Sequence, residues 1–223
     1  MAQPLAVAFD CDGVLADNGS SWQAIHDGFE TENKQMLAKF IAQEIDDDEF
    51  MADDVAKWME AKGRIHKDDI ARCYGGIRLM PGAREVVGRL QERGIVVAII
   101  SSGVDIFVGM IAAMLKVDDW VANGFDWDED GWMNGPAPSR VLSFDKGIMV
   151  DKLMRINDLS SDQIVSVGDS GSDLSMMIKG SSFIGFNPAG TWSMDAFKEA
   201  GVPIVKSRDL RDIWPILMDG EEF

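Results

Sequence analysis

The chain has 223 residues, 46% of them hydrophobic, which is enough to bury one sizeable core together with a small accessory domain. Its formal net charge of −17 argues against nucleic acid or anionic membrane as a partner held by a broad basic surface. No apolar run reaches the roughly 18 residues of a membrane span. No basic signal-peptide start precedes Asp10, and only Cys11 and Cys73 are present, so we expect a reduced, cytoplasmic protein.

The first predicted strand, Leu5–Phe9, runs directly into Asp10-Cys11-Asp12-Gly13. Side chains alternate along a strand, so Asp10 and Asp12 project to the same side and Cys11 to the opposite, buried side. Two carboxylates this close repel each other, and a cation beside them removes the conflict. Oxygen ligands of this kind suit Mg²⁺, whereas the plainer interpretation is a strand that ends in an acidic turn.

The stretch from Ser20 to Arg78 has helical periodicity and no convincing strand. We expect it to be a helical insertion that packs over the sheet, with residues 18–78 as a cap and residues 1–17 and 79–223 as the core. The acidic run from Glu44 to Glu49 is interpreted as a solvated turn between helices rather than a metal site.

The rest of the chain alternates short apolar segments with helical ones, which predicts an α/β fold with a doubly wound parallel sheet. In such sheets ligands bind beyond the carboxyl ends of the strands. Residues 118–136 break the alternation and suggest a β-hairpin around Asp128-Glu129-Asp130-Gly131. The predicted strands are Leu5–Phe9, Ile95–Ile100, Ile164–Val167, Ser182–Gly185 and Pro203–Val205, and the predicted helices are Ala83–Arg93, Val104–Leu115, Lys146–Arg155, Leu174–Lys179 and Thr191–Glu199.

Three further polar groups fall at predicted strand or helix ends. Ser101-Ser102-Gly103 follows a buried strand and opens a helix, where free N–H groups suit a phosphate, although serines also cap helices. Lys146 stands at a helix start, where the helix dipole disfavours a cation unless an anion lies in front of it; otherwise it is a solvated lysine. Asp169 and Asp173 follow the strand Ile164–Val167, a pattern typical of metal ligation and its support.

In this order the four groups resemble the motifs of the haloacid dehalogenase (HAD) superfamily of phosphohydrolases. Within it the chain is most similar to the phosphoserine phosphatase branch. The stretches that carry the resemblance are Ile100-Ser101-Ser102-Gly103-Val104-Asp105-Ile106, Asp145-Lys146-Gly147, Gly168-Asp169-Ser170-Gly171-Ser172-Asp173-Leu174-Ser175-Met176 and Ser207-Arg208-Asp209-Leu210-Arg211. The resemblance implies a Rossmann-like core with a cap of type C1 after the first strand.

The resemblance also implies a mechanism. Asp10 would accept the phosphoryl group as an aspartyl phosphate, and Asp12 would protonate the leaving oxygen and then deprotonate water. Mg²⁺ would be held by Asp10, by the backbone carbonyl of Asp12 and by Asp169, with Asp173 orienting these ligands.

On the phosphate side, the resemblance places the Ser101 hydroxyl and the N–H groups of Ser102 and Gly103 against phosphoryl oxygens. Lys146 would offset the negative charge of the nucleophile and the phosphate. It would thereby supply the positive charge that the acidic surface lacks.

The residues that would recognise serine depart from the branch. Gly13-Val14 replaces the usual Ser-Thr, Asp17–Ser21 contains no glutamate for the ammonium, and Phe50–Lys57 contains no arginine for the carboxylate. Phosphoserine is therefore only a candidate substrate. The missing charges could be replaced by Asp17, Lys57, Lys62, Arg64 or Arg72, whereas Trp22 and Trp58 could favour a more apolar or aromatic leaving group.

We therefore expect a Mg²⁺-dependent phosphatase of a small phosphorylated metabolite, acting as a monomer or homodimer. A phosphotransferase or phosphomutase would keep every motif. A phospho-accepting or Mg²⁺-binding signalling module is the alternative from another class, although the helical insertion and the Asp10/Asp12 pair argue against it.

Overall fold

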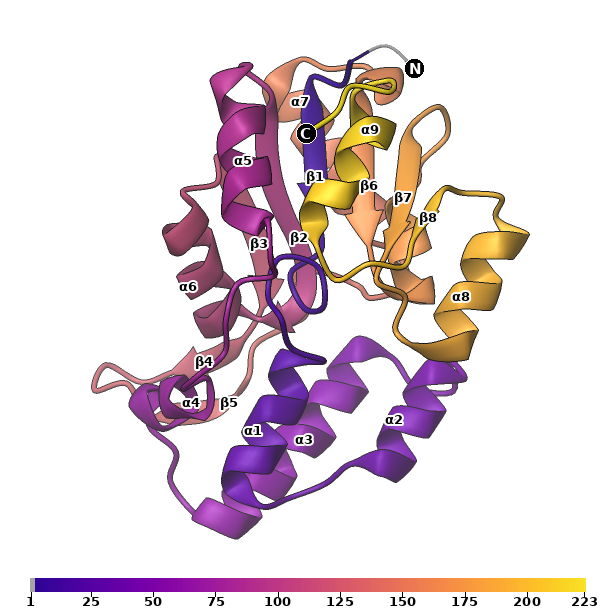
Figure 1. Ribbon diagram of the computed structural model, residues 1–223. Coiled ribbons are helices and arrows are strands. Elements are labelled where there is room, and N and C mark those ends of the chain that lie inside the picture. Colours follow the sequence, from indigo (N-terminus) through magenta and orange to yellow (C-terminus); the bar gives the residue numbers. More distant parts are fainter. Residues whose placement is uncertain (1–2) are drawn as a thin grey trace.

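The computed structural model describes residues 3–223, in which six parallel strands form one sheet in the order β3-β2-β1-β6-β7-β8 (Figure 1). The predicted α/β doubly wound sheet is therefore confirmed. The strands are β1 (Ala6–Phe9), β2 (Val96–Val104), β3 (Asp119–Asn123), β6 (Ile164–Gly168), β7 (Ser182–Phe186) and β8 (Ile204–Val205).

The central strand β1 is buried on both faces, as a parallel sheet covered by helices requires. Val7 and Phe9 pack into one apolar cluster, whereas Ala6 and Ala8 pack into another. The first cluster lies under α5 (Ala83–Glu92), α6 (Asp105–Leu115) and α9 (Trp214–Leu217), and the second under α7 (Gly147–Asn157) and α8 (Gly190–Glu199). The short 3₁₀ helices of this core are η1 (Ser161–Gln163), η2 (Gly171–Met176) and η3 (Leu210–Ile213).

The predicted helical stretch contains four helices, which lie together beyond the carboxyl end of β1 (Figure 1). They are α1 (Ser21–Phe29), α2 (Lys34–Ile41), α3 (Asp47–Lys62) and α4 (Lys67–Cys73). The start of α3 is defined by a capping box, in which the Asp46 side chain accepts from the Glu49 N–H and the Glu49 side chain accepts from the Asp46 N–H. Trp58 is fully buried between these helices.

Residues 118–136 hold more than the predicted hairpin. The hairpin is present as β4 (Phe125–Trp127) and β5 (Met133–Pro136), but the preceding residues form β3, an edge strand that pairs with β2. The predicted hairpin is therefore confirmed, whereas the strand list predicted from the sequence lacks β3. Edge strand β3 begins with the exposed Asp119 and Trp120, so it lacks the continuous apolar run by which the other strands are recognised.

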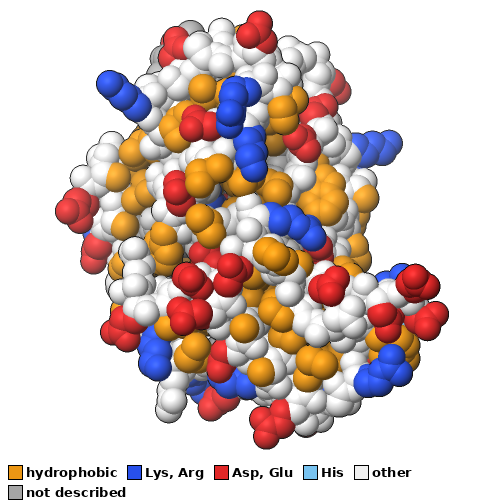
Figure 2. Space-filling view, turned by 180° about the vertical axis from the view of Figure 1, so that it is seen from behind, with side chains coloured by type: hydrophobic (Ala, Val, Ile, Leu, Met, Phe, Trp, Pro, Cys, Tyr) orange, Lys and Arg blue, Asp and Glu red, His pale blue; other side chains and the backbone are white. Residues whose placement is uncertain are grey.

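Two smaller predictions also differ from the structure. Strand β2 continues past Ile100 to Val104, and the predicted helix Leu174–Lys179 is instead the 3₁₀ turn η2 (Gly171–Met176). None of the helices within residues 3–223 has the length and apolar character needed to cross a membrane. Acidic side chains are spread over the face seen in Figure 2, where Lys and Arg occur singly or in small groups.

Candidate active site

The predicted site residues converge at the carboxyl ends of the central strands. Asp10 follows β1, Asp169 follows β6, and Ser101 lies in the last part of β2. Because these strands are parallel neighbours, their ends meet at the same edge of the sheet. Lys146 arrives from the N-cap of α7. All four side chains are buried, with exposed fractions of 8% or less.

Lys146 lies between two carboxylates. Its ammonium donates to Asp10 Oδ1 at 2.7 Å and to Asp173 Oδ1 at 2.6 Å, and only 2% of its side chain is exposed. The alternative of a solvated lysine is therefore wrong. A lysine at a helix start is unfavourable next to the helix dipole, and here the two facing carboxylates offset that effect. They raise the pKa of the Lys146 ammonium well above its usual range, although burial opposes them.

Asp173 ties the loop after β6 to Lys146. Its Oδ1 accepts from Lys146, while its Oδ2 accepts from the N–H groups of Asp169 and Ser170 and from the Ser170 hydroxyl. Both oxygens thus hold other groups of the site in place. The chain passes so closely that a Cβ on Gly168 would lie 2.3 Å from the Cβ of Asp173.

Asp12 faces a different set of partners. Its carboxylate accepts from the Asn18 side-chain amide at 2.6 Å and from the Ser21 hydroxyl at 2.8 Å. Ser21 in turn accepts from the Val104 N–H, which links Asp12 to the junction of β2 and α6. Sequence reasoning missed Asn18 and Ser21; two serines before a helix signal only an N-cap, and Ser20 does serve as that cap.

Gly13 makes the turn after the paired aspartates possible. Its φ of +76° lies in the left-handed region, and a Cβ there would lie 2.3 Å from Asp169 Oδ2. Asp169 can approach the end of β1 only because residue 13 has no side chain. Cys11 is fully buried, as predicted.

The hydroxyl segment is built differently from the prediction. Because β2 continues to Val104, Ser101-Ser102-Gly103 belongs to a strand and not to a helix N-terminus, which begins at Asp105. The Gly103 N–H is not free, since it donates to Ser101 Oγ at 3.1 Å. The pairing of β2 with β3 is irregular between Ile100 and Val104, so this part of β2 leaves the regular ladder.

Three carboxylates form the acidic group best placed for a cation among residues 3–223: Asp10, Asp169 and Asp173 have oxygens within 4.8 Å of one another. Burial, and repulsion from Asp173 and Asp12, raise the pKa of Asp10 to about 7 against the pull of Lys146. The pKa of Asp169 is raised well above its usual range by burial and by the neighbouring carboxylates. Lys146 alone does not balance this cluster, and an oxygen-only donor set with surplus negative charge fits Mg²⁺.

A cleft of about 400 Å³ opens between the helices α1–α3 and the sheet end. Ser102 and Ser170, neighbours of Ser101 and Asp169, line its core side, and Trp22 and Phe50 line its opposite side. The acidic run Glu44–Glu49 was expected to be solvated throughout, but Asp47 is buried at the cleft. Its carboxylate accepts from the Ser143 N–H and hydroxyl, which a pattern of acids alone does not reveal.

The replacements considered for the substrate-recognising charges lie elsewhere. Asp17 pairs with Arg208, and the cleft is lined by none of Asp17, Lys57, Lys62, Arg64 or Arg72. Trp22 does line the cleft, whereas Trp58 is buried behind it, where its indole N–H donates to His26 Nδ1.

Comparisons with known proteins agree with these motifs. The family model of the haloacid dehalogenase-like hydrolases matches residues 7–177. A phosphoserine phosphatase of Methanocaldococcus jannaschii is 27% identical over 209 residues, which cover 93% of this chain and 94% of that protein. A phosphoserine phosphatase of Halobacterium salinarum is 24% identical and covers 82% of this chain and 85% of that one.

Solved structures show the same fold. A substrate-bound phosphoserine phosphatase complex has a TM-score of 0.79 at 24% identity, covering 97% of this chain and 99% of that chain. A phospho-aspartyl intermediate analogue of phosphoserine phosphatase has a TM-score of 0.79 at 25% identity, covering 96% of this chain and 99% of that chain. The predicted resemblance and the predicted enzyme class, a HAD-type phosphatase, are thereby confirmed. This chain belongs to the haloacid dehalogenase-like hydrolase family.

Proposed function

We propose that this chain hydrolyses phosphate monoesters of small metabolites in a Mg²⁺-dependent reaction that passes through a phosphoryl group on Asp10. The observation that carries the proposal is the buried contact between Lys146 Nζ and Asp10 Oδ1 at 2.7 Å. A buried ammonium favours the ionised form of a buried carboxylate and can also attract the three equatorial oxygens of a transferring phosphoryl group.

In this proposal the acids have separate tasks. Asp10 Oδ2, the oxygen for which Lys146 does not compete, attacks phosphorus, and the ester oxygen departs as the P–O bond breaks. Asp12 gives that oxygen a proton; burial raises the pKa of Asp12, which favours the protonated acid. Asp12 then takes a proton from the water that releases phosphate from Asp10.

The metal-binding residues follow from the donor set. Asp10, Asp169 and the Asp12 backbone carbonyl would hold Mg²⁺, with Asp173 orienting Asp169 through its N–H. The ion would supply charge stabilisation for the phosphoryl oxygens. Ser101, Ser102, Gly103 and Lys146 would bind the phosphate, and because Gly103 N–H now bonds to Ser101, that bond must yield when a phosphate binds.

The proposal is tested with p-nitrophenyl phosphate, whose activated leaving group needs little from the cleft. We expect sustained, Mg²⁺-dependent release of phosphate that Asp10→Asn abolishes and that the exposed control Asp151→Asn on α7 retains. Activity retained in Asp10→Asn would disprove Asp10 as the phosphoryl acceptor. A single turnover without further release would favour the phospho-accepting module, and transfer to an added alcohol in preference to water would favour a phosphotransferase.

A further inference from the structure

The cleft beside the site is where the leaving group of a bound ester must lie. The phosphoryl group has to reach Asp10 next to Ser101, and the cleft begins at Ser102, Ser170 and Ser172 on the adjoining loops. The cleft ends at helices α1–α3, so the side chains that line the cleft contact the alcohol part of the substrate. The chemistry of this lining therefore decides which esters fit.

No lysine or arginine lines the cleft within residues 3–223. Its acidic and basic side chains are Asp47 and His26. The Asp47 carboxylate is held by the N–H and hydroxyl of Ser143. The His26 ring is engaged within the helices, since its Nε2 lies 3.1 Å from the buried Asp54 Oδ1 and its Nδ1 accepts from the Trp58 indole. A substrate carboxylate placed here would lose its water without gaining a cationic partner, which is strongly unfavourable.

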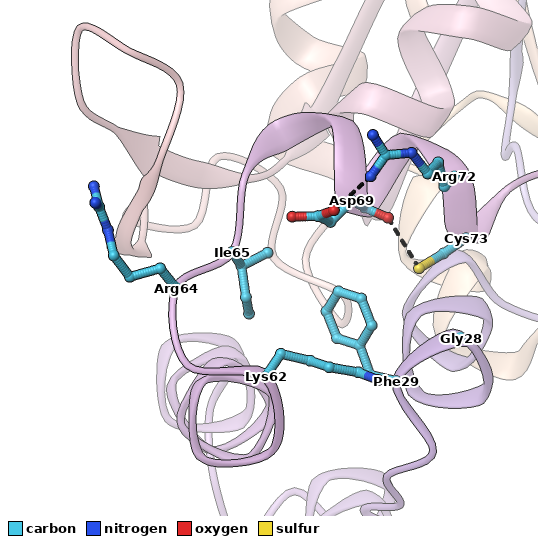
Figure 3. Close-up of a pocket in the computed structure, with 8 residues that line it drawn as sticks. All are labelled: Gly28, Phe29, Lys62, Arg64, Ile65, Asp69, Arg72 and Cys73. Atoms are coloured by element: carbon cyan, nitrogen blue, oxygen red, sulfur yellow. Dashed lines mark hydrogen bonds and ion pairs between the residues drawn. The ribbon is translucent and has the colours of Figure 1, made fainter.

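Lys62, Arg64 and Arg72 of the helical stretch lie around a different pocket, with which the cleft shares no lining residue (Figure 3). Arg72 pairs with Asp69 at 2.6 Å, the Arg64 guanidinium lies 4.4 Å from the Trp132 ring centre, and the Lys62 ammonium lies over the Phe29 ring. Lys57, on α3, pairs with Asp53 at 2.5 Å. Each has a partner away from the cleft.

The two asparagines of the cleft and its Ser193 are also engaged. The Asn123 amide donates to Val141 O, and its oxygen accepts from the N–H groups of Arg140 and Val141. Asn33 donates to the buried Asp54, and Ser193 bonds to Ala189 O and Gly171 N. These groups are not free to replace an arginine around a carboxylate.

What remains exposed to a ligand is largely apolar. Leu37 and five aromatic rings line the cleft, those of Trp22, Phe40, Phe50, Phe144 and Trp192. Phe40 stacks on Phe50 with ring centres 4.6 Å apart and leans against Phe144 at 5.6 Å. Leu37 and Trp192 are 39% and 46% exposed, so a ligand that covers them gains apolar burial.

We infer that the site selects phosphate monoesters whose leaving alcohol is uncharged and largely apolar, and that it discriminates against carboxylate-bearing esters such as phosphoserine. This inference rests on the proposed phosphatase function and names its substrate class. The inferred substrate class differs from that of the relatives, whose names specify phosphoserine.

The test compares primary alkyl esters that differ in charge: 2-phenylethyl phosphate, O-phosphoethanolamine, O-phospho-L-serine and 3-phosphoglycerate. We expect kcat/KM for 2-phenylethyl phosphate to exceed those of both carboxylate-bearing esters at least about tenfold. Phosphoserine equal to or better than the phenylethyl ester would overturn the inference, as would phosphoethanolamine as the best substrate. Hydrolysis of p-nitrophenyl phosphate in the same assay reports separately on the proposed function, because it can persist when the preference fails.

A charge placed in the cleft tests the same inference from the protein side. Leu37→Arg adds a cation at a partly exposed position of α2, and Leu37→Gln is the uncharged control of similar polarity. We expect Leu37→Arg to raise the ratio of kcat/KM for 3-phosphoglycerate to that for 2-phenylethyl phosphate about tenfold relative to Leu37→Gln. An equal ratio in the two variants would show that the missing cation does not set the preference.

Discussion

Lys146 Nζ lies 2.7 Å from Asp10 Oδ1, although 136 residues separate the two in the sequence. The contact is buried, and the same ammonium also reaches Asp173. One cation thus holds together the segment after β1, the loop after β6 and the start of α7.

Replacing Lys146 with methionine keeps most of the unbranched side chain and removes its charge. We expect Lys146→Met to lower the free energy of unfolding of the metal-free protein by about 3–5 kcal/mol, because two buried carboxylates lose their common partner. Urea unfolding in the presence of a chelator measures this loss. Lys152→Met, on the exposed side of the same helix, is the control and should change the stability little. Equal effects of the two substitutions would show that the buried bridge adds nothing.

A methyl group at Gly13 tests the close approach of Asp169. In Gly13→Ala the left-handed backbone costs about 1–2 kcal/mol, and the added Cβ also displaces Asp169. Gly94→Ala has a similar φ of +71° with nothing within 4 Å of the new Cβ, so it reports the backbone effect alone. We expect both variants to lose stability, but only Gly13→Ala to lose Mg²⁺ binding, as measured by calorimetry. Unchanged Mg²⁺ affinity in Gly13→Ala would contradict the assignment of Asp169.

Removing the Ser21 hydroxyl should shift the pH dependence of the reaction. Hydrogen bonds from Ser21 and Asn18 lower the pKa of Asp12 against the effect of burial, so Ser21→Ala and Asn18→Ala should both raise it. Because the proposal requires Asp12 to be protonated when the ester breaks, the limb of the kcat profile that reports this acid should move to higher pH in each variant. A lower kcat with an unmoved profile would indicate that the two residues serve only the local packing.

Stability without metal should fall as the pH rises through the range in which Asp10 ionises. The pKa of Asp10 is about 7 in the folded protein against 3.8 ordinarily, so between these values the folded state binds more protons than the unfolded state. Asp169 acts in the same direction. The urea midpoint in a chelator should therefore be lower at about pH 8 than at about pH 5, and Mg²⁺ should restore it most at the higher pH, where it competes least with protons. A midpoint that rises over this interval would contradict the raised pKa values.

The sequence made the main elements predictable where local pattern and packing agree. Leu5–Phe9 is apolar throughout because both faces of β1 are covered by helices. The aspartates that follow it lie at the carboxyl ends of the parallel strands, where ligands bind. The meeting of Asp10, Lys146 and Asp169 was predictable because each follows a strand or begins a helix at one sheet edge.

Other features depend on tertiary packing that leaves no local signal. The edge strand β3 gains its place from pairing with β2 and not from its own apolar residues. Asp47 looks like one acid among several, and only the approach of Ser143, 96 residues away, makes it a buried acceptor. The Ser101–Gly103 segment remains extended where its composition favours a helix start.

Phosphoryl transfer to Asp10 is tested most directly by trapping the intermediate. The Asp12→Asn variant still holds the nucleophile but lacks the base that activates water, so an activated ester should phosphorylate it faster than water releases the group. After mixing with p-nitrophenyl phosphate and Mg²⁺ and quenching in acid, peptide mass spectrometry should find one phosphoryl group on Asp10 and none in Asp10→Asn/Asp12→Asn. A phosphoryl group on another residue, or p-nitrophenol released without any phosphorylated peptide, would contradict the mechanism.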